Sequence, residues 1–146
     1  MTSKLILING SRCSGKSLLS KELYKSLDKT ILINLDSIKW LYSSYDKENS
    51  YSLQLAKKVS LKMVEEYIKE GLNIIIERAF NFYEYIKPYV DLKNKVDVEI
   101  ILINIEAPLK VLLERNKSRV HITPKENRIT KIETIRKSFE HYNNNK

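Results

Sequence analysis

Hydrophobic residues alternate along the chain between short continuous runs and longer stretches with helical spacing. The short runs are rich in Ile and Leu and bounded by polar or turn-forming residues, which predicts strands at 4–9, 30–35, 73–78 and 98–105. Because little polar sequence interrupts these runs, we expect all four strands to be buried on both faces. Short strands separated by helical segments are typical of an α/β fold with a parallel sheet.

The segments between the runs predict helices, because their apolar residues lie three and four positions apart. The first helix is expected at 18–27, and the second at 53–68, with Gly71 as its C-cap. A third begins near Pro108, and Thr-Pro-Lys-Glu at 123–126 predicts the start of a last helix. Residues 143–146 are expected to form a polar tail.

Composition narrows the class of protein. The chain has 146 residues and a single cysteine, so it can bury a core and cannot form an internal disulfide. No Cys/His cluster has metal-ligand spacing, which argues against a structural zinc domain. The longest apolar runs are far below the roughly 20 residues that span a bilayer. We therefore expect one domain over residues 1–146, a cytoplasmic location and no membrane association.

Positive charge is concentrated near the C-terminus. The formal net charge is +8, and residues 110–137 hold nine Lys or Arg against three Glu. A solvated helix face explains such a stretch, and so does a surface that binds a polyanion. We leave both interpretations open.

The segment after the first predicted strand carries the main chemical signal. Its sequence, Gly-Ser-Arg-Cys-Ser-Gly-Lys-Ser at 10–17, fits the P-loop pattern G-x-x-x-x-G-K-[ST] at every fixed position. Such a loop points backbone N–H groups at phosphates, with Lys16 on the β- and γ-phosphates and Ser17 on Mg²⁺. The predicted nucleotide-binding residues here are Gly10, Ser11, Arg12, Cys13, Ser14, Gly15, Lys16, Ser17 and Leu18.

Polar residues also follow the second and third predicted strands, at the edge where ligands gather in doubly wound sheets. Asp36 is a candidate base or Mg²⁺ partner, although it would equally serve as a helix N-cap. Trp40, one helical turn later, would either wall an acceptor pocket or pack in the core. Glu77 and Arg78 would bind substrate or support Mg²⁺, or else form a structural ion pair.

Two arginines, Arg115 and Arg119, lie four residues apart and so share one face of the third predicted helix. They lead into a polar loop, and we expect a short lid at about 115–127 that brings positive charge to the phosphates and excludes water. An ordinary basic helix end, which complements the helix dipole, is the alternative.

In order and in type, these features resemble the P-loop kinase superfamily of nucleoside, nucleotide and small-metabolite kinases. The resemblance implies a three-layer α/β/α fold with strand order 2-3-1-4, and ATP with Mg²⁺ as cofactors. It also implies that Arg115 lies over the adenine, that Arg119 reaches the phosphates and that Asp36 is the acceptor-side base. The chain departs from the pattern in having no recognisable fifth strand and no Asp at the end of the third or fourth strand.

We therefore predict a phosphotransferase that uses Mg²⁺ and ATP and acts on a small hydroxyl compound, nucleoside or nucleotide. Lys16, Asp36 and Arg119 are the predicted catalytic residues, Arg115 binds the nucleotide, and Ser17 and Asp36 bind the metal. One alternative is a polynucleotide 5′-hydroxyl kinase, for which the basic C-terminal stretch speaks, although a nucleic-acid partner is not the favoured interpretation. The other is a regulator that binds ATP without catalysis.

Overall fold

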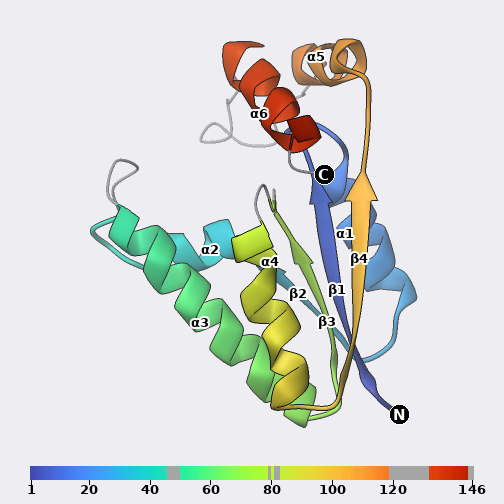
Figure 1. Cartoon of the computed structure of the whole chain (residues 1–146), viewed down its shortest axis with the longest axis vertical. Helices are drawn as coiled ribbons and strands as arrows, with labels where there is room; N and C mark the ends of the chain where they lie inside the picture. The colour runs from blue at the N-terminus through green and yellow to red at the C-terminus, as the bar shows by residue number, and fades with distance from the viewer. Residues whose placement is uncertain (46–49, 79, 81–82, 119–131, 145–146) are drawn as a thin grey trace.

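The structure is a computed structural model that describes residues 1–45, 50–78, 80, 83–118 and 132–144 (Figure 1). Four parallel strands form one sheet in the order β2-β3-β1-β4, which confirms the predicted order. The strands are β1 (Ser3–Gly10), β2 (Thr30–Asn34), β3 (Asn73–Glu77) and β4 (Val98–Ile105).

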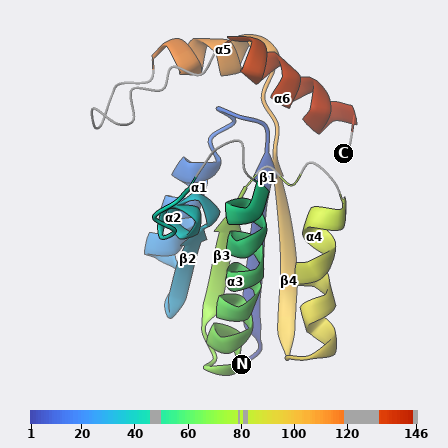
Figure 2. The ribbon, with the colours of Figure 1, turned by 90° about the vertical axis from the view of Figure 1, so that its left-hand side faces the viewer.

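Helices cover both faces of the sheet, because successive side chains of a strand point to opposite faces. Leu5 and Leu7 of β1 belong to the larger core cluster, under α3 (Ser50–Lys69) and α4 (Tyr83–Val90). Ile6 and Ile8 point the other way, to the apolar side of α1 (Lys16–Ser26). Figure 2 shows α3 and α1 on opposite sides of the strands, as a three-layer fold requires.

The remaining elements lie at the ends of the sheet. A short helix, α2 (Leu35–Trp40), follows β2, and a 3₁₀ turn, η1 (Asp91–Asn94), precedes β4. Beyond the carboxyl ends of β1 and β4, α5 (Leu109–Lys117) and α6 (Ile132–Asn144) form an arm (Figure 1). Ile135 of α6 is fully buried there. None of the helices in the described part of the chain combines the length and apolar character of a bilayer crossing.

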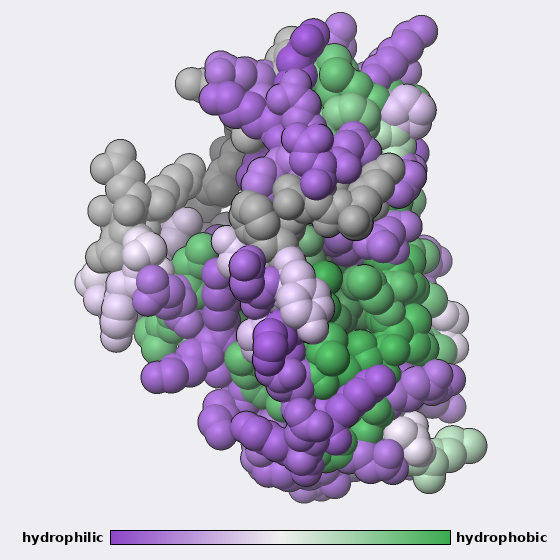
Figure 3. All heavy atoms as spheres, viewed as in Figure 1, coloured by the Kyte–Doolittle hydropathy of each residue, from purple (hydrophilic) through white to green (hydrophobic). Residues whose placement is uncertain are grey.

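Three expectations need comment. The edge strand β4 is not buried on both faces, since Leu102 is 44% exposed, and apolar residues gather at the surface beside it in Figure 3. The polar tail was expected from residue 143, but α6 continues to Asn144. The predicted start of the last helix, at 123–126, lies outside the described residues.

Strand register brings the predicted polar residues to one edge of the sheet. Glu77 of β3 pairs with Ile8 of β1 on one side and with Asn34 of β2 on the other. Asn9 then ties three strands together, since its amide donates to Asn104 Oδ1 (3.0 Å) and its Oδ1 accepts from the Phe80 backbone N–H (2.8 Å). The loop after β1, the end of β3 and the start of α2 are therefore held side by side.

Candidate active site

The loop between β1 and α1 is shaped by two of its glycines. A Cβ at Gly10 would lie 2.6 Å from Ser14 Oγ and 2.7 Å from the Ile105 carbonyl oxygen, so the backbones of the loop and of β4 approach too closely for a side chain. Gly15 has a φ of 105°, a conformation that glycine adopts without strain. Cys13 also has a positive φ, 65°, and lies in the curled part of the loop.

Lys16 reaches back across this loop. Its ammonium donates to the carbonyl oxygens of Gly10 (2.8 Å) and Ser11 (2.7 Å). Ser14 Oγ is buried and has no hydrogen-bond partner in the described part of the chain. The loop thus offers a flexible cation and an unsatisfied hydroxyl, and its backbone is too closely packed at Gly10 for an extra methyl group. These features suit the binding of a phosphate chain.

A hollow of about 240 Å³ lies over the loop. Arg115 closes one side of it from α5, and its guanidinium donates to the carbonyl oxygen of Ser14 (2.8 Å). Gly10 and Ser11 do not line the hollow, and they contribute through the carbonyls that hold Lys16. Its lining consists of the other predicted nucleotide-binding residues: Arg12, Cys13, Ser14, Gly15, Lys16, Ser17, Leu18 and Arg115.

Ser17, predicted to bind Mg²⁺, lies against Glu77. Its hydroxyl donates to Glu77 Oε1 (3.0 Å), and the buried Ser20, one turn along α1, donates to Glu77 Oε2 (3.2 Å). No group of three His, Cys, Asp or Glu among the described residues could hold a metal ion. A single hydroxyl and a single carboxylate still fit Mg²⁺, which keeps several waters and takes its other ligands from phosphates.

A second, larger cavity of about 410 Å³ opens beside the loop. Of the described residues that line it, four carry cationic side chains, two carry carboxylates and none is aromatic. Arg12, Lys16 and Ser17 line this cavity and the nucleotide hollow alike, so the two spaces meet at these residues. The described residues that line it are Arg12, Lys16, Ser17, Asn34, Leu35, Asp36, Lys39, Leu53, Glu77, Arg78 and Ser138.

Asp36 lies on the wall of the larger cavity, in the first turn of α2. It is not the N-cap: Asn34 fills that position, with its Oδ1 accepting from the backbone N–H of Asp36 at 2.8 Å. The Asp36 carboxylate forms an ion pair with Lys39, one turn later. The hydroxyl of Ser17 donates to Glu77 and not to Asp36.

Trp40 satisfies neither interpretation of its role. It is the last residue of α2, and it is not among the described residues that line the cavity, although its neighbour Lys39 is. Its side chain is 55% exposed, so it does not belong to the core either.

Arg78 follows β3 and is held from several sides. Its backbone N–H donates to the Ile8 carbonyl (3.2 Å), which extends the pairing of β3 with β1 by one residue. Its guanidinium carbon lies 5.5 Å from the centre of the Phe80 ring and 5.0 Å from that of Tyr85. Burial lowers the pKa of Arg78, against the raising effects of Tyr89, Tyr85 and Asp36.

Several lining residues were not predicted from the sequence. Lys39 could have been found from its i,i+3 spacing to Asp36, which places both on one helical face. Ser138 carries no such signal: it comes from α6, 126 residues after Arg12, whose backbone N–H donates to its hydroxyl (3.1 Å). Arg119 and most of the predicted lid, 115–127, lie outside the described residues.

Comparison with known proteins gives three kinds of result. The sequence model of the AAA domain family matches residues 5–142. No curated protein matches the chain. One chain of the Pnkp1/Rnl/Hen1 RNA repair complex has a similar structure, with a TM-score of 0.82 and 17% identity over 98% of this chain and 45% of that one. The present chain therefore spans less than half of that relative.

Two further solved structures match over most of both chains. A candidate kinase from Chloroflexus aurantiacus has a TM-score of 0.71 and 22% identity, over 93% of this chain and 79% of that one. The tunicamycin resistance protein of Deinococcus radiodurans has a TM-score of 0.66 and 16% identity, over 97% and 80%. At these identities the likeness lies in the fold.

Proposed function

Because this chain belongs to the AAA domain family and has a P-loop kinase-like fold, we propose that it is an ATP-dependent phosphotransferase acting on a hydroxyl group. One observation carries the proposal: Lys16 and Ser17 line both the nucleotide hollow and the larger cavity, in which Asp36 also lies. A γ-phosphate held by the loop would therefore face a space large enough for a second substrate.

The proposed reaction is an in-line displacement. The acceptor oxygen forms a bond to the γ-phosphorus while the bond from that phosphorus to the β–γ bridging oxygen breaks, and ADP leaves with the bonding electron pair. The acceptor proton passes to the Asp36 carboxylate and from there to solvent. Lys16 exchanges its carbonyl partners for phosphate oxygens, which neutralises charge as the bond breaks.

Ser17 and Glu77 would hold Mg²⁺ in this scheme, with Asp36 left for the acceptor. When bound, Mg²⁺ supplies charge neutralisation on the β- and γ-phosphates. Glu77 contributes directly or through water, and its contacts with Ser17 and Ser20 fix the orientation of its carboxylate. Arg115 lies where it can contact the nucleotide from the side of α5.

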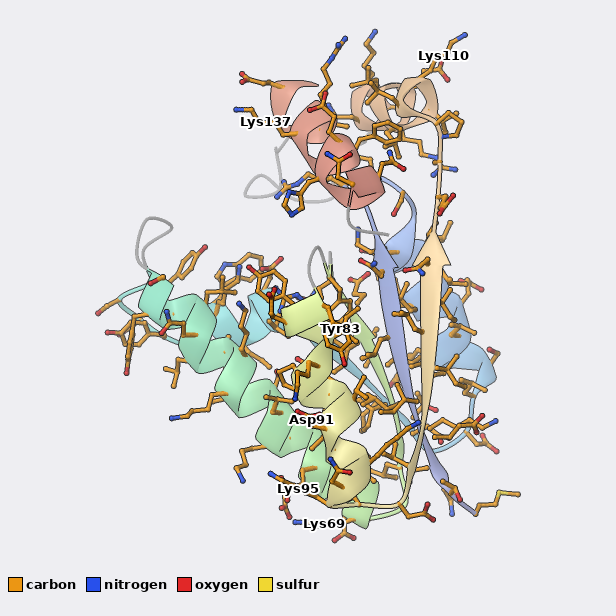
Figure 4. The ribbon with its side chains drawn as sticks, viewed as in Figure 1. Lys69, Tyr83, Asp91, Lys95, Lys110 and Lys137 are labelled. Carbon is orange, nitrogen blue, oxygen red and sulfur yellow. The ribbon has the colours of Figure 1, made fainter. Side chains whose placement is uncertain are left out.

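A polynucleotide 5′-hydroxyl kinase is the second candidate, and it gives the same chemistry a different acceptor. Two observations support it: the structural likeness to a chain of an RNA repair complex, and the basic residues of the arm. Lys110 and Lys137 extend from α5 and α6 at the outer end of the arm (Figure 4). A nucleic acid lying across the arm would meet this charge, and its binding would weaken steeply as salt rises.

The test is transfer of labelled γ-phosphate from ATP with Mg²⁺ to nucleosides, nucleotides, sugars and 5′-hydroxyl oligonucleotides. Asp36→Asn should lower turnover by about 10²- to 10⁴-fold, the range of general-base contributions, and leave ATP affinity intact. Asp91→Asn, which changes another exposed acid paired with a lysine, should leave both unchanged.

Lys16→Ala should abolish transfer, whereas Lys25→Ala, on the exposed side of the same helix, should not. Wild-type turnover in Asp36→Asn would refute the role of Asp36 as the general base. ATP binding without transfer to any acceptor would instead point to a regulator that binds ATP without catalysis.

A further inference from the structure

The charges around the larger cavity are unevenly paired. Asp36 forms an ion pair with Lys39, and the Glu77 carboxylate accepts from Ser17 and Ser20. Arg78 forms no ion pair with any residue in the described ranges. Arg12, the other guanidinium that lines the cavity, also has no ion pair in the described ranges, but it lines the nucleotide hollow as well, so Arg78 is the unneutralised guanidinium on the acceptor side.

Aromatic rings hold Arg78 in place without using its hydrogen-bonding capacity. The rings of Phe80 and Tyr85 lie within 5.5 Å of the guanidinium carbon, so the contacts are of the cation–π type. A guanidinium has five N–H donors in its plane, arranged to match a carboxylate or phosphate. Because Arg78 also lines the cavity, donors that remain available can serve a ligand inside it.

A second cation, Lys57, adds positive potential close to Arg78, although Lys57 is not among the described residues that line the cavity. Lys57 of α3 lies 4.3 Å from the centre of the Tyr85 ring, which Arg78 also contacts. Lys57 likewise forms no ion pair in the part of the chain that the structure describes. Burial, followed by the charge of Arg78, lowers the pKa of Lys57. Two cations that raise each other's energy are stabilised when an anion binds between or beside them.

Among the described residues, no aromatic side chain lines the cavity where a base could stack on it. The exposed Trp40 is not among its lining residues, and neither are Phe80 and Tyr85. Recognition of an acceptor must therefore rely on charge and hydrogen bonds more than on stacking. The other two cations, Arg12 and Lys16, line the nucleotide hollow as well, where the triphosphate would engage them.

We propose that the acceptor carries a phosphate group of its own, and that Arg78 binds this group while the acceptor hydroxyl lies at Asp36. The inference rests on the proposed phosphotransferase function and narrows its substrate class. A phosphate monoester of a small molecule and a phosphodiester of an oligonucleotide share the chemistry that Arg78 recognises. A neutral nucleoside or sugar lacks it and is expected to be a poor acceptor.

The experiment compares acceptors without a phosphate with related acceptors that carry one or more phosphates. Adenosine is compared with adenosine 3′-phosphate and with a 5′-hydroxyl oligonucleotide, and ribose with ribose 5-phosphate. In the wild type, kcat/KM should be about 10- to 100-fold higher for a phosphorylated member, the range expected when hydrogen bonds to a charged group are made. Preference for the monoester or for the oligonucleotide then identifies the source of the phosphate.

Variants assign the preference to its residues. Arg78→Gln should bring the ratio of kcat/KM values for a pair close to one, and Arg78→Lys should give an intermediate ratio because it keeps the charge but loses the planar donors. Lys57→Gln should lower the ratio by only about threefold, because Lys57 acts on the bound phosphate from a greater distance than Arg78. Lys58→Gln, at the exposed neighbouring position, should not change it. If Arg78→Gln does not fold, as its melting curve will show, Lys57→Gln and Arg78→Lys decide.

Two results would overturn the proposal. One is an equal kcat/KM for both members of every pair. The other is a wild-type preference that persists in Arg78→Gln. If no acceptor is phosphorylated, the phosphotransferase function fails by itself. Calorimetric titration of adenosine 3′-phosphate and ribose 5-phosphate in the presence of MgADP then tests the subsite alone: binding that Arg78→Gln weakens about tenfold supports it, and no binding or unchanged binding refutes it.

Discussion

Replacing Gly10 by Ala tests the loop geometry on which the nucleotide site depends. The added methyl group would lie 2.6 Å from Ser14 Oγ and 2.7 Å from the Ile105 carbonyl oxygen. The serine hydroxyl can turn away, but the carbonyl belongs to the last residue of β4 and moves only if the strand end moves. The Cβ of Ile105, 3.3 Å from the position of the added methyl group, restricts it further.

The cost follows from this overlap. Forcing one extra methyl group into a packed site costs about 1–3 kcal/mol, and for a domain near this size each kcal/mol lowers Tm by roughly 2–4 °C. We therefore expect Gly10→Ala to lower Tm by about 2–12 °C. The Gly10 carbonyl also accepts from Lys16, so its displacement should weaken ATP binding at least about tenfold.

Gly71→Ala is the matched control. Gly71 has a φ of 76° and no atom within 4 Å of the position of an added Cβ, so the substitution introduces backbone strain without a clash. That strain costs about 1 kcal/mol, and ATP affinity should stay at the wild-type value because Gly71 is at the end of α3. Thermal melting and calorimetric ATP titration measure both quantities. Wild-type Tm and ATP affinity in Gly10→Ala would refute the close approach of the loop to β4.

Three further substitutions test other contacts. Glu77→Gln removes the charge next to Ser17 but keeps an acceptor oxygen, so a Mg²⁺ titration should give half-maximal activity at a clearly higher concentration with little change in Tm; an unchanged titration would exclude Glu77 from the metal site. Arg115→Met loses the hydrogen bond to the Ser14 carbonyl and should raise KM for ATP about tenfold, without an equal rise in KM for the acceptor. Burial raises the pKa of Tyr89 above its ordinary value of 10.0, so its stabilising contribution is complete below pH 10 and is lost as the pH rises through the higher folded-state pKa; denaturant titrations of Tyr89→Phe should show a weaker loss of stability above pH 10 than the wild type.

The sheet was predictable because its signals are local. Each strand is a continuous run of Ile and Leu, and the strand order follows once a P-loop is recognised after the first strand. The same runs misled on burial, because a run of apolar residues looks alike in a central and an edge strand. Leu102 is an apolar residue within such a run, but it is 44% exposed because β4, in the described part of the chain, pairs only with β1.

The site was predictable only where it is built from neighbours in sequence. The loop residues follow one another, and Asp36, Glu77 and Arg78 were found because parallel strands end at one edge. The contact of Ser17 with Glu77 depends on strand register and on the facing turn of α1, which composition does not encode. Trp40 was misplaced because a spacing of four residues only approximates one helical face: Lys39, three residues after Asp36, lines the cavity, whereas the side chain of Trp40 is largely exposed.

The acceptor side shows why substrate class is harder to predict than reaction class. Phosphate binding by the loop is a property of eight consecutive residues, so the sequence pattern alone indicates it. The larger cavity instead takes Arg12 from the loop, Arg78 from the end of β3 and Ser138 from α6. The pairing of β1 with β3 places the first two segments, and the contact of Ser138 with the Arg12 backbone places the third. The positive charge available to a ligand in that cavity depends on which of its carboxylates already have partners. It can be assessed only when the partners of Asp36 and Glu77 are known. Arg78 acquires its proposed role because the carboxylates of Asp36 and Glu77 both have other partners. The sequence around Arg78 does not indicate those contacts.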